Sequence, residues 1–383
     1  MSTLSHKLTA CLFALTVLTL GIISLGPLEQ YRSGPQLDPI TGELARSVEQ
    51  HYDDHFPARD LGTNLWAAIN YRLFREGRPG VAIGQGDWLF SEEELYPASQ
   101  DPNLVDTNLD RVLAISNYLQ QQGIPMALLV VPSKARIYAD KLGEHQPTPE
   151  MAGLYERFLQ NLDQAGVFAP YLRPSLAKAA NQGVNVFLRT DTHWTPSGAD
   201  IFALHAAEYI RENFDQTSWG EQQYVTTLDK PQLHRGDLLT YIPLEPLFSD
   251  LGPAPDLFSV RTTTAMEDSP SSSQALFADN TASVVLVGTS YSANPLWDFP
   301  GALRKHLGRD LINVADEGQG PIVPMVEYLQ SPDFRNHPPE LVIWEFPERY
   351  LAQPLESEQT LAWFQRSERL LAKAAGSKTA KYP

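Results

Sequence analysis

The sequence has few of the features on which several classes of protein depend. Cysteine is almost absent, because the only one in 383 residues is Cys11, which lies in an apolar stretch near the N-terminus. The rest of the chain therefore cannot form an internal disulfide, and its fold must be stabilised by a hydrophobic core. A basic surplus is also missing, since 29 Lys and Arg stand against 46 Asp and Glu, which gives a formal net charge of −17. A chain without excess positive charge to neutralise phosphates is not expected to bind nucleic acid.

Long apolar runs are equally scarce. The uncharged run from Leu8 to Gly26 is preceded by Lys7 and approaches the roughly 20 residues that a helix needs to cross a bilayer. We predict that residues 1–30 form an uncleaved signal anchor, which spans the inner membrane through residues 8–26 and places the rest of the chain in the periplasm. The alternative is a cleaved signal peptide, for which Ser24 and Gly26 supply the small residues, and which releases a soluble periplasmic protein.

Beyond the predicted anchor, strand and helix patterns alternate. Residues 31–50 are polar and contain proline and glycine, so we predict a spacer there and a folded domain at residues 51–365. Short runs rich in Val, Ile and Leu alternate in this domain with stretches of helical periodicity. This pattern predicts an α/β fold, a parallel sheet with helices on both faces. The predicted strands are residues 126–131, 184–188, 283–287, 311–314 and 341–344, and the predicted helices are residues 108–122, 149–165, 196–213 and 321–329.

Two segments depart from this alternation. Residues 214–280 contain repeated prolines and a run of serines, which predicts an insertion of loops and short strands. Residues 366–383 are basic and rich in small residues, which indicates a frayed tail.

A serine follows the predicted strand at residues 283–287, in the sequence Gly-Thr-Ser-Tyr-Ser from Gly288 to Ser292. The glycine allows a tight turn, and ligands of open α/β sheets bind at the carboxyl ends of the strands. Ser290 is therefore a candidate nucleophile, and Ser292 is the rival serine. Because Gly-x-Ser turns are common, this motif alone does not identify an enzyme.

The polar residues Asp191 and His193 follow another predicted strand. Residues two apart in an extended segment project to the same side, so the Asp191 carboxylate can orient the His193 ring. With Ser290 at the same edge of the sheet, the three residues have the chemistry of a catalytic triad. Their order, Asp then His then Ser, disfavours the α/β-hydrolase fold. A metal site built on Asp191, His193 and His234 lacks the usual spaced ligands, so we expect no metal and no tightly bound cofactor.

These motifs together resemble those of the SGNH-like alginate O-acetyltransferases, the AlgJ/AlgX group, in which Asp-x-His-Trp precedes Gly-Thr-Ser-Tyr-Ser. The resemblance extends over most of residues 50–355, through segments 86–90, 131–134, 191–194, 234–238, 288–292 and 344–350. It implies an SGNH-hydrolase-like, flavodoxin-like fold with permuted motif order. It also implies that Ser290 is the nucleophile, His193 the base and Asp191 the residue that orients the base.

The third SGNH motif normally supplies an Asn that has no clear counterpart here. Candidate oxyanion donors are therefore Arg349, Tyr350 and the backbone N–H groups of Ser290, Gly318 and Gly320. We expect a further set of aromatic residues to form a rim that covers the acyl group and stacks against a sugar ring; they are Trp194, Tyr291 and Trp297.

The function implied by the resemblance is acetyl transfer through Ser290 onto hydroxyls of an exported polysaccharide, with an integral-membrane acyltransferase as the source of acetyl groups. Two alternatives remain open: a carbohydrate acetylesterase with the same triad, and a non-catalytic polysaccharide-binding subunit of an export complex. The resemblance favours alginate as the polymer. Because alginate is a polyanion and the chain is acidic, cellulose or another neutral exopolysaccharide remains open as well.

Overall fold

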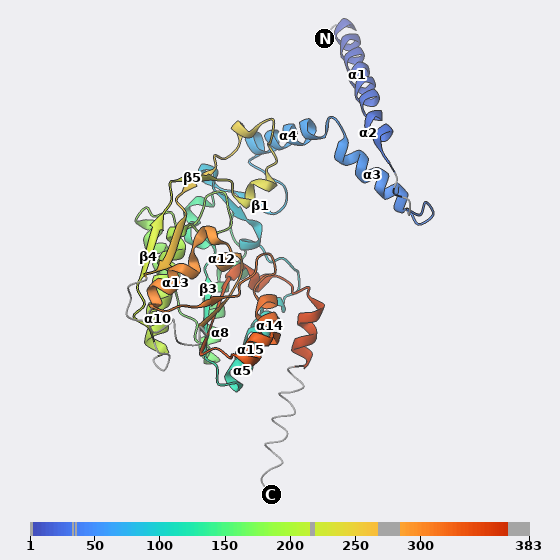
Figure 1. Cartoon of the computed structure of the whole chain (residues 1–383). Helices are drawn as coiled ribbons and strands as arrows, with labels where there is room; N and C mark the ends of the chain where they lie inside the picture. Colours follow the sequence, from blue (N-terminus) through green and yellow to red (C-terminus); the bar gives the residue numbers. More distant parts are fainter. Residues whose placement is uncertain (1–2, 33, 35–36, 215–218, 267–283, 367–383) are drawn as a thin grey trace. The chain divides into compact units, whose positions relative to one another are not determined.

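The computed structural model describes residues 3–32, 34, 37–214, 219–266 and 284–366 (Figure 1). Two compact units make up the chain. The smaller consists of residues 1–77 and 240–254, and the larger of residues 78–239 and 255–383. The larger unit contains the central sheet and the three residues of the predicted triad, so it is the unit that positions the site.

The smaller unit begins with the apolar segment that was predicted to cross a membrane. Helices α1 (Thr3–Ile23) and α2 (Leu25–Gln30) form most of a candidate span, His6–Gln30, within which an 18-residue window has a mean hydropathy of 2.3. It is long and apolar enough to cross a bilayer, a property that export signals near an N-terminus share. The segment predicted as a spacer is partly helical, because α3 (Glu43–His55) begins within it.

Helix α4 (Arg59–Ile69) follows in the smaller unit and continues directly into a short π-helical turn, η1 (Asn70–Phe74). The Asn64 side chain on α4 donates a hydrogen bond to the Pro243 carbonyl at 2.7 Å. This bond attaches residues 240–254, which come from much later in the sequence, to α4.

Four parallel strands form the central sheet of the larger unit, as far as the structure describes it. Their spatial order is β3 (Met126–Val131), β10 (Leu341–Pro347), β8 (Val284–Val287) and β9 (Ile312–Asn313). In the register of the sheet, Ile343 of β10 lies opposite Ala127 on one side and Leu286 on the other. Since all four strands are parallel, their carboxyl ends share one edge, where ligands of such sheets bind.

The apolar strands are buried on both sides because helices cover both faces of the sheet (Figure 1). Alternate residues of β3 belong to two separate core clusters: Leu129 lies in one, and Leu128 lies in the other. The first cluster includes residues of α9 (Arg173–Asn181), α10 (Pro196–Asn213) and α13 (Phe299–Leu307), and the second includes residues of α5 (Leu104–Gln121), α8 (Leu154–Gln164) and α14 (Ile322–Gln330). The predicted fold class is confirmed.

The predicted strand at residues 184–188 is wrong. Only an isolated antiparallel bridge, between Phe187 and Trp194, occurs in this stretch. The Leu188 N–H donates to the His193 carbonyl at 3.1 Å, so the chain doubles back on itself in a tight loop. Val186, Phe187 and Leu188 are buried in the core cluster that contains α10, and this burial, without sheet pairing, explains why the sequence resembles that of a strand.

The remaining elements are short and surround the sheet. The predicted helix at residues 149–165 is divided into α7 (Pro149–Ala152) and α8, and residues 358–366 are helical. Antiparallel pairs are formed by β1 (Val81–Ile83) with β2 (Leu89–Ser91), β4 (Tyr224–Leu228) with β7 (Arg261–Ala265), and β5 (Gln232–His234) with β6 (Asp256–Phe258). The short helices are α6 (Lys134–Ile137), α12 (Ser290–Ala293), α15 (Pro332–Asn336), η2 (Gln85–Asp87), η3 (Glu92–Glu94), η4 (Ala139–Lys141), η5 (Asp237–Tyr241), η6 (Ser249–Leu251), η7 (Pro295–Trp297) and η8 (Glu348–Ala352).

Three predicted segments extend beyond the described residues. Ser283, the first residue of a predicted strand, lies outside them, as do residues 215–218 and 267–280 of the predicted insertion. Of the predicted basic tail, residues 367–383 also lie outside.

Candidate active site

Ser290 lies at the carboxyl end of β8, where the chain turns from the strand into α12. Gly288 makes the turn possible, because a Cβ at that position would lie only 2.6 Å from Glu345 Oε2 and 2.8 Å from Ser292 Oγ. The Thr289 hydroxyl caps α12 by accepting a hydrogen bond from the Tyr291 N–H. The turn therefore holds Ser290 at the edge of the sheet where the four strands end.

A buried carboxylate accepts hydrogen bonds from this turn. Glu345 of β10 accepts hydrogen bonds from the Ser292 hydroxyl at 2.6 Å and from the Thr289 N–H at 3.1 Å. Burial raises the pKa of Glu345 to about 7, although the bonds from Ser292 and Thr289 oppose the shift. Because Ser292 is buried and its hydroxyl is bound to Glu345, the geometry favours Ser290 over its rival as the nucleophile.

Ser290, His193 and Asp191 lie in one hydrogen-bonded line. Ser290 Oγ is 2.7 Å from His193 Nε2, and His193 Nδ1 is 2.7 Å from Asp191 Oδ1. The His193 N–H also donates to Asp191 Oδ1, at 2.9 Å. These are the contacts expected of a nucleophile, a base and the carboxylate that orients the base. The sequence predicted all three residues, but Asp191 and His193 come from the tip of the loop described above and not from a strand end.

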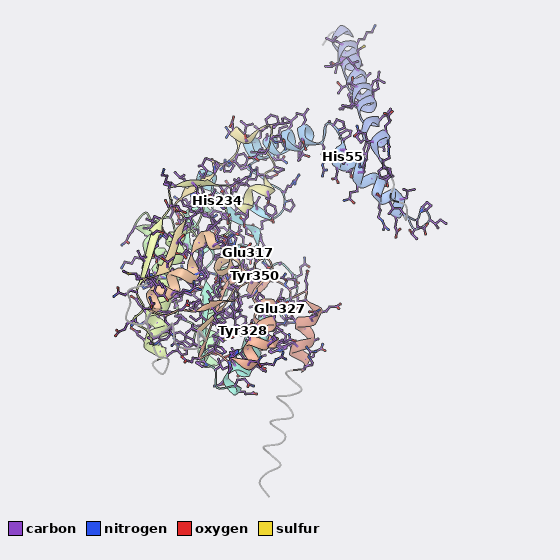
Figure 2. All side chains as sticks on the ribbon, viewed as in Figure 1. His55, His234, Glu317, Glu327, Tyr328 and Tyr350 are labelled. Atoms are coloured by element: carbon purple, nitrogen blue, oxygen red, sulfur yellow. The ribbon has the colours of Figure 1, made fainter. Side chains whose placement is uncertain are left out.

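A second histidine binds the other oxygen of Asp191. His234, at the end of β5 (labelled in Figure 2), places Nε2 2.9 Å from Asp191 Oδ2. Burial acts to raise the pKa of Asp191, but the hydrogen bonds from His193 and His234 outweigh it and hold that pKa well below its ordinary value. The bond to Asp191 in turn raises the pKa of His234. Sequence reasoning considered His234 only as a metal ligand, and its place in the matching segment 234–238 was the one available signal.

Asp237 holds the residue between the two triad members on this loop. Its carboxylate accepts from the Thr192 N–H at 2.8 Å and from the Thr192 hydroxyl at 2.6 Å, and its own N–H donates to Asp191 Oδ2 at 3.1 Å. Ligand atoms of Asp191, His193 and Asp237 all lie within 4.8 Å of one another, close enough to hold a metal ion. Because these hydrogen bonds already engage the three groups, the arrangement is explained without a metal.

Asp256 of β6 fixes the start of the same loop. Its carboxylate accepts from the Thr190 N–H at 2.9 Å, from the Thr190 hydroxyl at 2.5 Å and from the Arg189 N–H at 2.8 Å. Gly236 approaches so closely that a Cβ there would lie 2.1 Å from the Thr190 carbonyl oxygen, a distance that only glycine avoids. The predicted insertion thus supplies His234, Asp237 and Asp256, whose side chains bind the loop that carries Asp191 and His193. Sequence reasoning missed this role, because acidic residues in a proline-rich segment are usually solvated.

Lys134 supports the loop from the side of the sheet. This fully buried side chain donates to the Arg189 carbonyl at 3.0 Å and to the Asp191 carbonyl at 2.9 Å. Its ammonium lies over the rings of Trp88 and Phe90, 5.5 and 5.2 Å from their centroids, where cation–π attraction offsets part of the lost hydration. Burial lowers the pKa of Lys134 to about 8, against the opposing effect of nearby carboxylates such as Glu94.

The predicted aromatic rim is wrong, because Trp194, Tyr291 and Trp297 are buried, with at most 1% of each side chain exposed. Trp297 stacks against the His193 ring at a centroid distance of 5.3 Å. The Tyr291 hydroxyl donates to the Thr192 carbonyl. These aromatic residues pack around the base and keep it in place, so they offer no surface to a sugar. The large side chains are buried because they fill the space next to the turn that carries Ser290.

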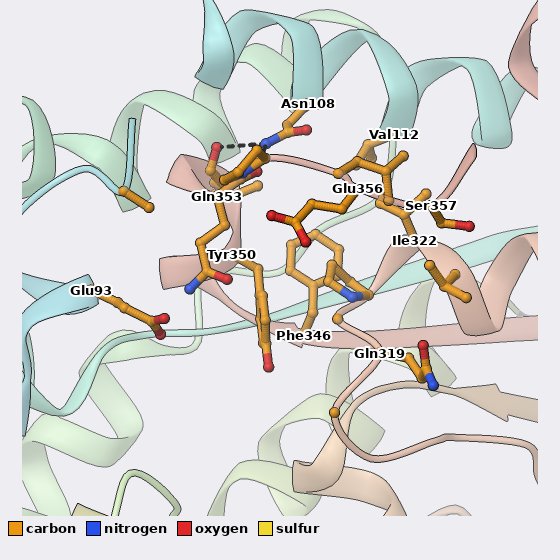
Figure 3. Close-up of a pocket in the computed structure, with 18 residues that line it drawn as sticks. Glu93, Asn108, Val112, Gln319, Ile322, Phe346, Tyr350, Gln353, Glu356 and Ser357 are labelled. Atoms are coloured by element: carbon orange, nitrogen blue, oxygen red, sulfur yellow. Dashed lines mark hydrogen bonds between the residues drawn. The ribbon is translucent and has the colours of Figure 1, made fainter. Parts of the chain in front are cut away.

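Of the other candidate site residues, Gly318, Gly320 and Tyr350 line a cleft, and Arg349 does not. A cleft of about 730 Å³ is lined by Gly318, Gly320 and Tyr350, together with Glu93, Asn108, Gln319, Gln353 and Glu356 (Figure 3). The triad residues do not line it. Arg349 is buried. Its guanidinium lies over the rings of Tyr291 and Tyr350, and its Nη1 donates to the Tyr291 hydroxyl at 3.3 Å. Arg349 therefore connects the cleft to the turn that carries Ser290.

Comparison with known proteins gives consistent matches. Residues 81–348 match the family described as "SGNH hydrolase-like domain, acetyltransferase AlgX". The chain is 44% identical over 332 residues to the probable alginate O-acetylase AlgJ of Pseudomonas putida, which covers 87% of this chain and 86% of that protein. It is 46% identical over 325 residues to the probable alginate O-acetylase AlgJ of Pseudomonas aeruginosa, which covers 83% and 82%. The solved O-acetyltransferase domain of P. putida AlgJ matches with a TM-score of 0.68 at 40% identity, covering 76% of this chain and 99% of that one.

Proposed function

Because this chain belongs to the family of SGNH hydrolase-like acetyltransferase domains named after AlgX, we propose that it transfers acetyl groups onto hydroxyls of alginate through an acetyl-enzyme on Ser290. The observation that supports the proposal most directly is the hydrogen-bonded line from Ser290 through His193 to Asp191. The names of its relatives, probable alginate O-acetylases, support alginate as the polymer.

In the first step, Ser290 Oγ attacks the carbonyl carbon of the acetyl donor while its proton passes to His193 Nε2. Asp191, ionised and bound to Nδ1, stabilises the imidazolium that forms. The tetrahedral intermediate carries an oxyanion, for which we propose the backbone N–H groups of Ser290 and of Gly318 or Gly320 as donors. The intermediate collapses, His193 returns the proton to the leaving group, and the acetyl group remains on Ser290.

In the second step, a sugar hydroxyl gives its proton to His193 Nε2 as its oxygen attacks the acetyl carbonyl. Collapse of this second intermediate breaks the bond to Ser290 Oγ, which recovers its proton from His193. The sugar ester leaves and the free enzyme is restored. Water in place of the sugar gives the acetylesterase alternative with the same residues.

A neutral polymer is the second candidate acceptor, and the cleft provides the observation that favours it. Two of its polar lining residues, Glu93 and Glu356, are acidic (Figure 3), and carboxylates at close range repel a polyanion. The cleft is also lined by the amides of Gln319 and Gln353, a group that binds hydroxyls of charged and neutral sugars alike. Mannuronate and cellulose oligosaccharides, compared as acceptors, distinguish the two polymers.

We also propose that residues 8–26 anchor the enzyme in the inner membrane with its catalytic unit in the periplasm. The apolar span His6–Gln30 supports this placement. Because acetyl donors are made in the cytoplasm, an integral-membrane acyltransferase is the proposed partner that delivers acetyl groups across the bilayer.

The test is turnover of a small activated acetyl ester with and without mannuronate oligosaccharides. The proposal predicts that the acceptor raises total turnover and yields acetylated sugar, detected by mass spectrometry. If only free acetate forms at saturating acceptor, at the rate found without it, the esterase alternative holds. An enzyme that binds the oligosaccharide but cleaves no ester is the polysaccharide-binding subunit.

A further inference from the structure

Helix α4 and the adjoining turn η1 leave one apolar face uncovered. Five large apolar side chains are exposed there: Leu61 by 52%, Leu65 by 46%, Trp66 by 63%, Leu73 by 72% and Phe74 by 60%. At 3.6 residues per turn the first three project from one side of α4, and η1 continues that side. The buried residues Asn64, Ala68 and Tyr71 lie on the adjacent side, next to Leu61. Exposed apolar stripes of this kind mark interaction surfaces.

Charge around this face differs from charge in the rest of the chain. Residues 59–77 contain three arginines and two acidic residues in a chain whose formal net charge is −17, and Arg59 is paired with Asp54 at 2.7 Å, so the local basic character comes from Arg72 and Arg75. Arg72 and Arg75 lie in or next to η1. A helix with Trp, Phe and Leu on one side and arginine nearby has the character of segments that lie in the interface of an anionic bilayer. The tryptophan supports this comparison, because its ring favours the headgroup level.

The position of α4 in the sequence brings it close to a membrane. The candidate span ends at Gln30 and α4 begins at Arg59. The linking residues 31–58 include the 13 residues of α3 and reach at most about 70 Å when the helix rises about 1.5 Å per residue and the rest is fully extended. A tether of this length gives even a weak interfacial segment a high effective concentration at the bilayer surface.

We propose that the apolar face of α4 and η1 is a membrane-binding surface that inserts into the headgroup and acyl boundary of anionic phospholipids, in the same bilayer that residues 8–26 span. This inference rests on the proposed anchor. It does not depend on the chemistry at Ser290. Its consequence is a second attachment, which holds the chain just after the anchor against the membrane surface from which acetyl groups are delivered.

The single cysteine of the chain makes a depth measurement simple. In full-length protein carrying Cys11→Ser, one new cysteine is introduced at Leu73 or, as a control, at Val225 on β4, which is 46% exposed. Each is labelled with a nitroxide, and the protein is reconstituted into vesicles of phosphatidylethanolamine and phosphatidylglycerol. Power-saturation EPR then compares collisions with oxygen, which concentrates in acyl chains, and with a water-soluble nickel chelate. We expect the ratio of oxygen to nickel collisions to be several-fold higher at position 73 than at position 225.

A second variant tests whether the apolar face itself causes the insertion. Leu65→Ser, Trp66→Ser and Phe74→Ser together are expected to lower the ratio at position 73 to that at position 225, with acetyl-ester turnover in detergent unchanged. Equal ratios at both positions without these substitutions overturn the proposal. A label at position 73 that is shielded from both reagents overturns it too, because protein then covers the face. Vesicle flotation reports separately on the anchor, and ester turnover reports on the proposed activity.

Discussion

At the scale of single residues, Asp191 is the side chain on which the contacts of the site converge. Its Oδ1 accepts from the ring and the backbone of His193, and its Oδ2 accepts from His234 and from the backbone of Asp237. Four donors around one carboxylate keep it ionised. The Asp191 carboxylate can therefore orient His193 and stabilise positive charge on its ring. A side chain that donates hydrogen bonds cannot replace it, because the four surrounding groups are themselves donors.

Replacement of Asp191 by Asn tests this role. The amide nitrogen of Asp191→Asn must face N–H donors, and a neutral amide cannot stabilise an imidazolium. We expect turnover of an acetyl ester to fall by roughly 10³- to 10⁴-fold, as when triad carboxylates are changed in other serine enzymes. Circular dichroism should show that the fold is kept. Turnover near that of the wild type would mean that another group orients His193.

His234 is expected to act as a positioning residue through Asp191. Loss of a hydrogen bond to a charged group costs about 1.5–3 kcal/mol, so His234→Ala should lower kcat by roughly 10- to 100-fold with little change in KM. His234→Gln is the matched control, because its amide N–H can restore the donor to Asp191. Partial recovery by Gln supports positioning, whereas equal losses in both variants point to another role for the ring.

At the scale of elements, the site depends on how β8 and β10 lie side by side. Glu345 of β10 is held against the turn that follows β8 by bonds from Thr289 and Ser292. A carboxylate at this position is costly when charged, because burial outweighs the hydrogen bonds from its three donors and raises the pKa of Glu345 to about 7. The turn that carries Ser290 is therefore linked to the protonation of Glu345 on the neighbouring strand.

This linkage predicts a pH-dependent stability. The folded protein holds the Glu345 proton more tightly than the unfolded chain, whose ordinary pKa is 4.5. The stabilisation is therefore fully present below pH 4.5 and is lost as the pH rises through about 7, by about 3 kcal/mol. Glu345→Gln should lose less stability over this window in urea unfolding at pH 5 and pH 8. Identical pH dependence in the two proteins contradicts the assignment.

Local patterns predicted strands of the central sheet and helices that cover it, but they misread one apolar run that packs without sheet pairing. The runs at 126–131 and 341–344 were read correctly because their burial and their pairing coincide. The run at 184–188 has the same apolar composition but is buried against helices, and composition alone does not distinguish the two cases. His234 and Asp256 reach the loop of Asp191 from far along the chain, so no local periodicity indicates their contacts.

At the scale of the whole molecule, the chain combines an apolar span with an acidic catalytic unit. Its formal net charge of −17 opposes a polyanionic acceptor at long range. At physiological ionic strength, salt largely screens the repulsion between exposed charges that are more than about 8 Å apart. The choice of acceptor must therefore depend on local contacts near Ser290, for which the cleft connected through Arg349 is a candidate.

The central claim, that Ser290 carries the acetyl group between donor and sugar, is tested most directly by trapping the intermediate. The full-length enzyme in detergent is mixed with an activated acetyl ester, quenched in acid and digested, and the peptide that contains residues 288–292 is sequenced by mass spectrometry. The account predicts acetylation on Ser290, its disappearance when mannuronate oligosaccharide is added before the quench, and its absence in Ser290→Ala. Acetyl found on Ser292, or turnover that continues in Ser290→Ala, would contradict it.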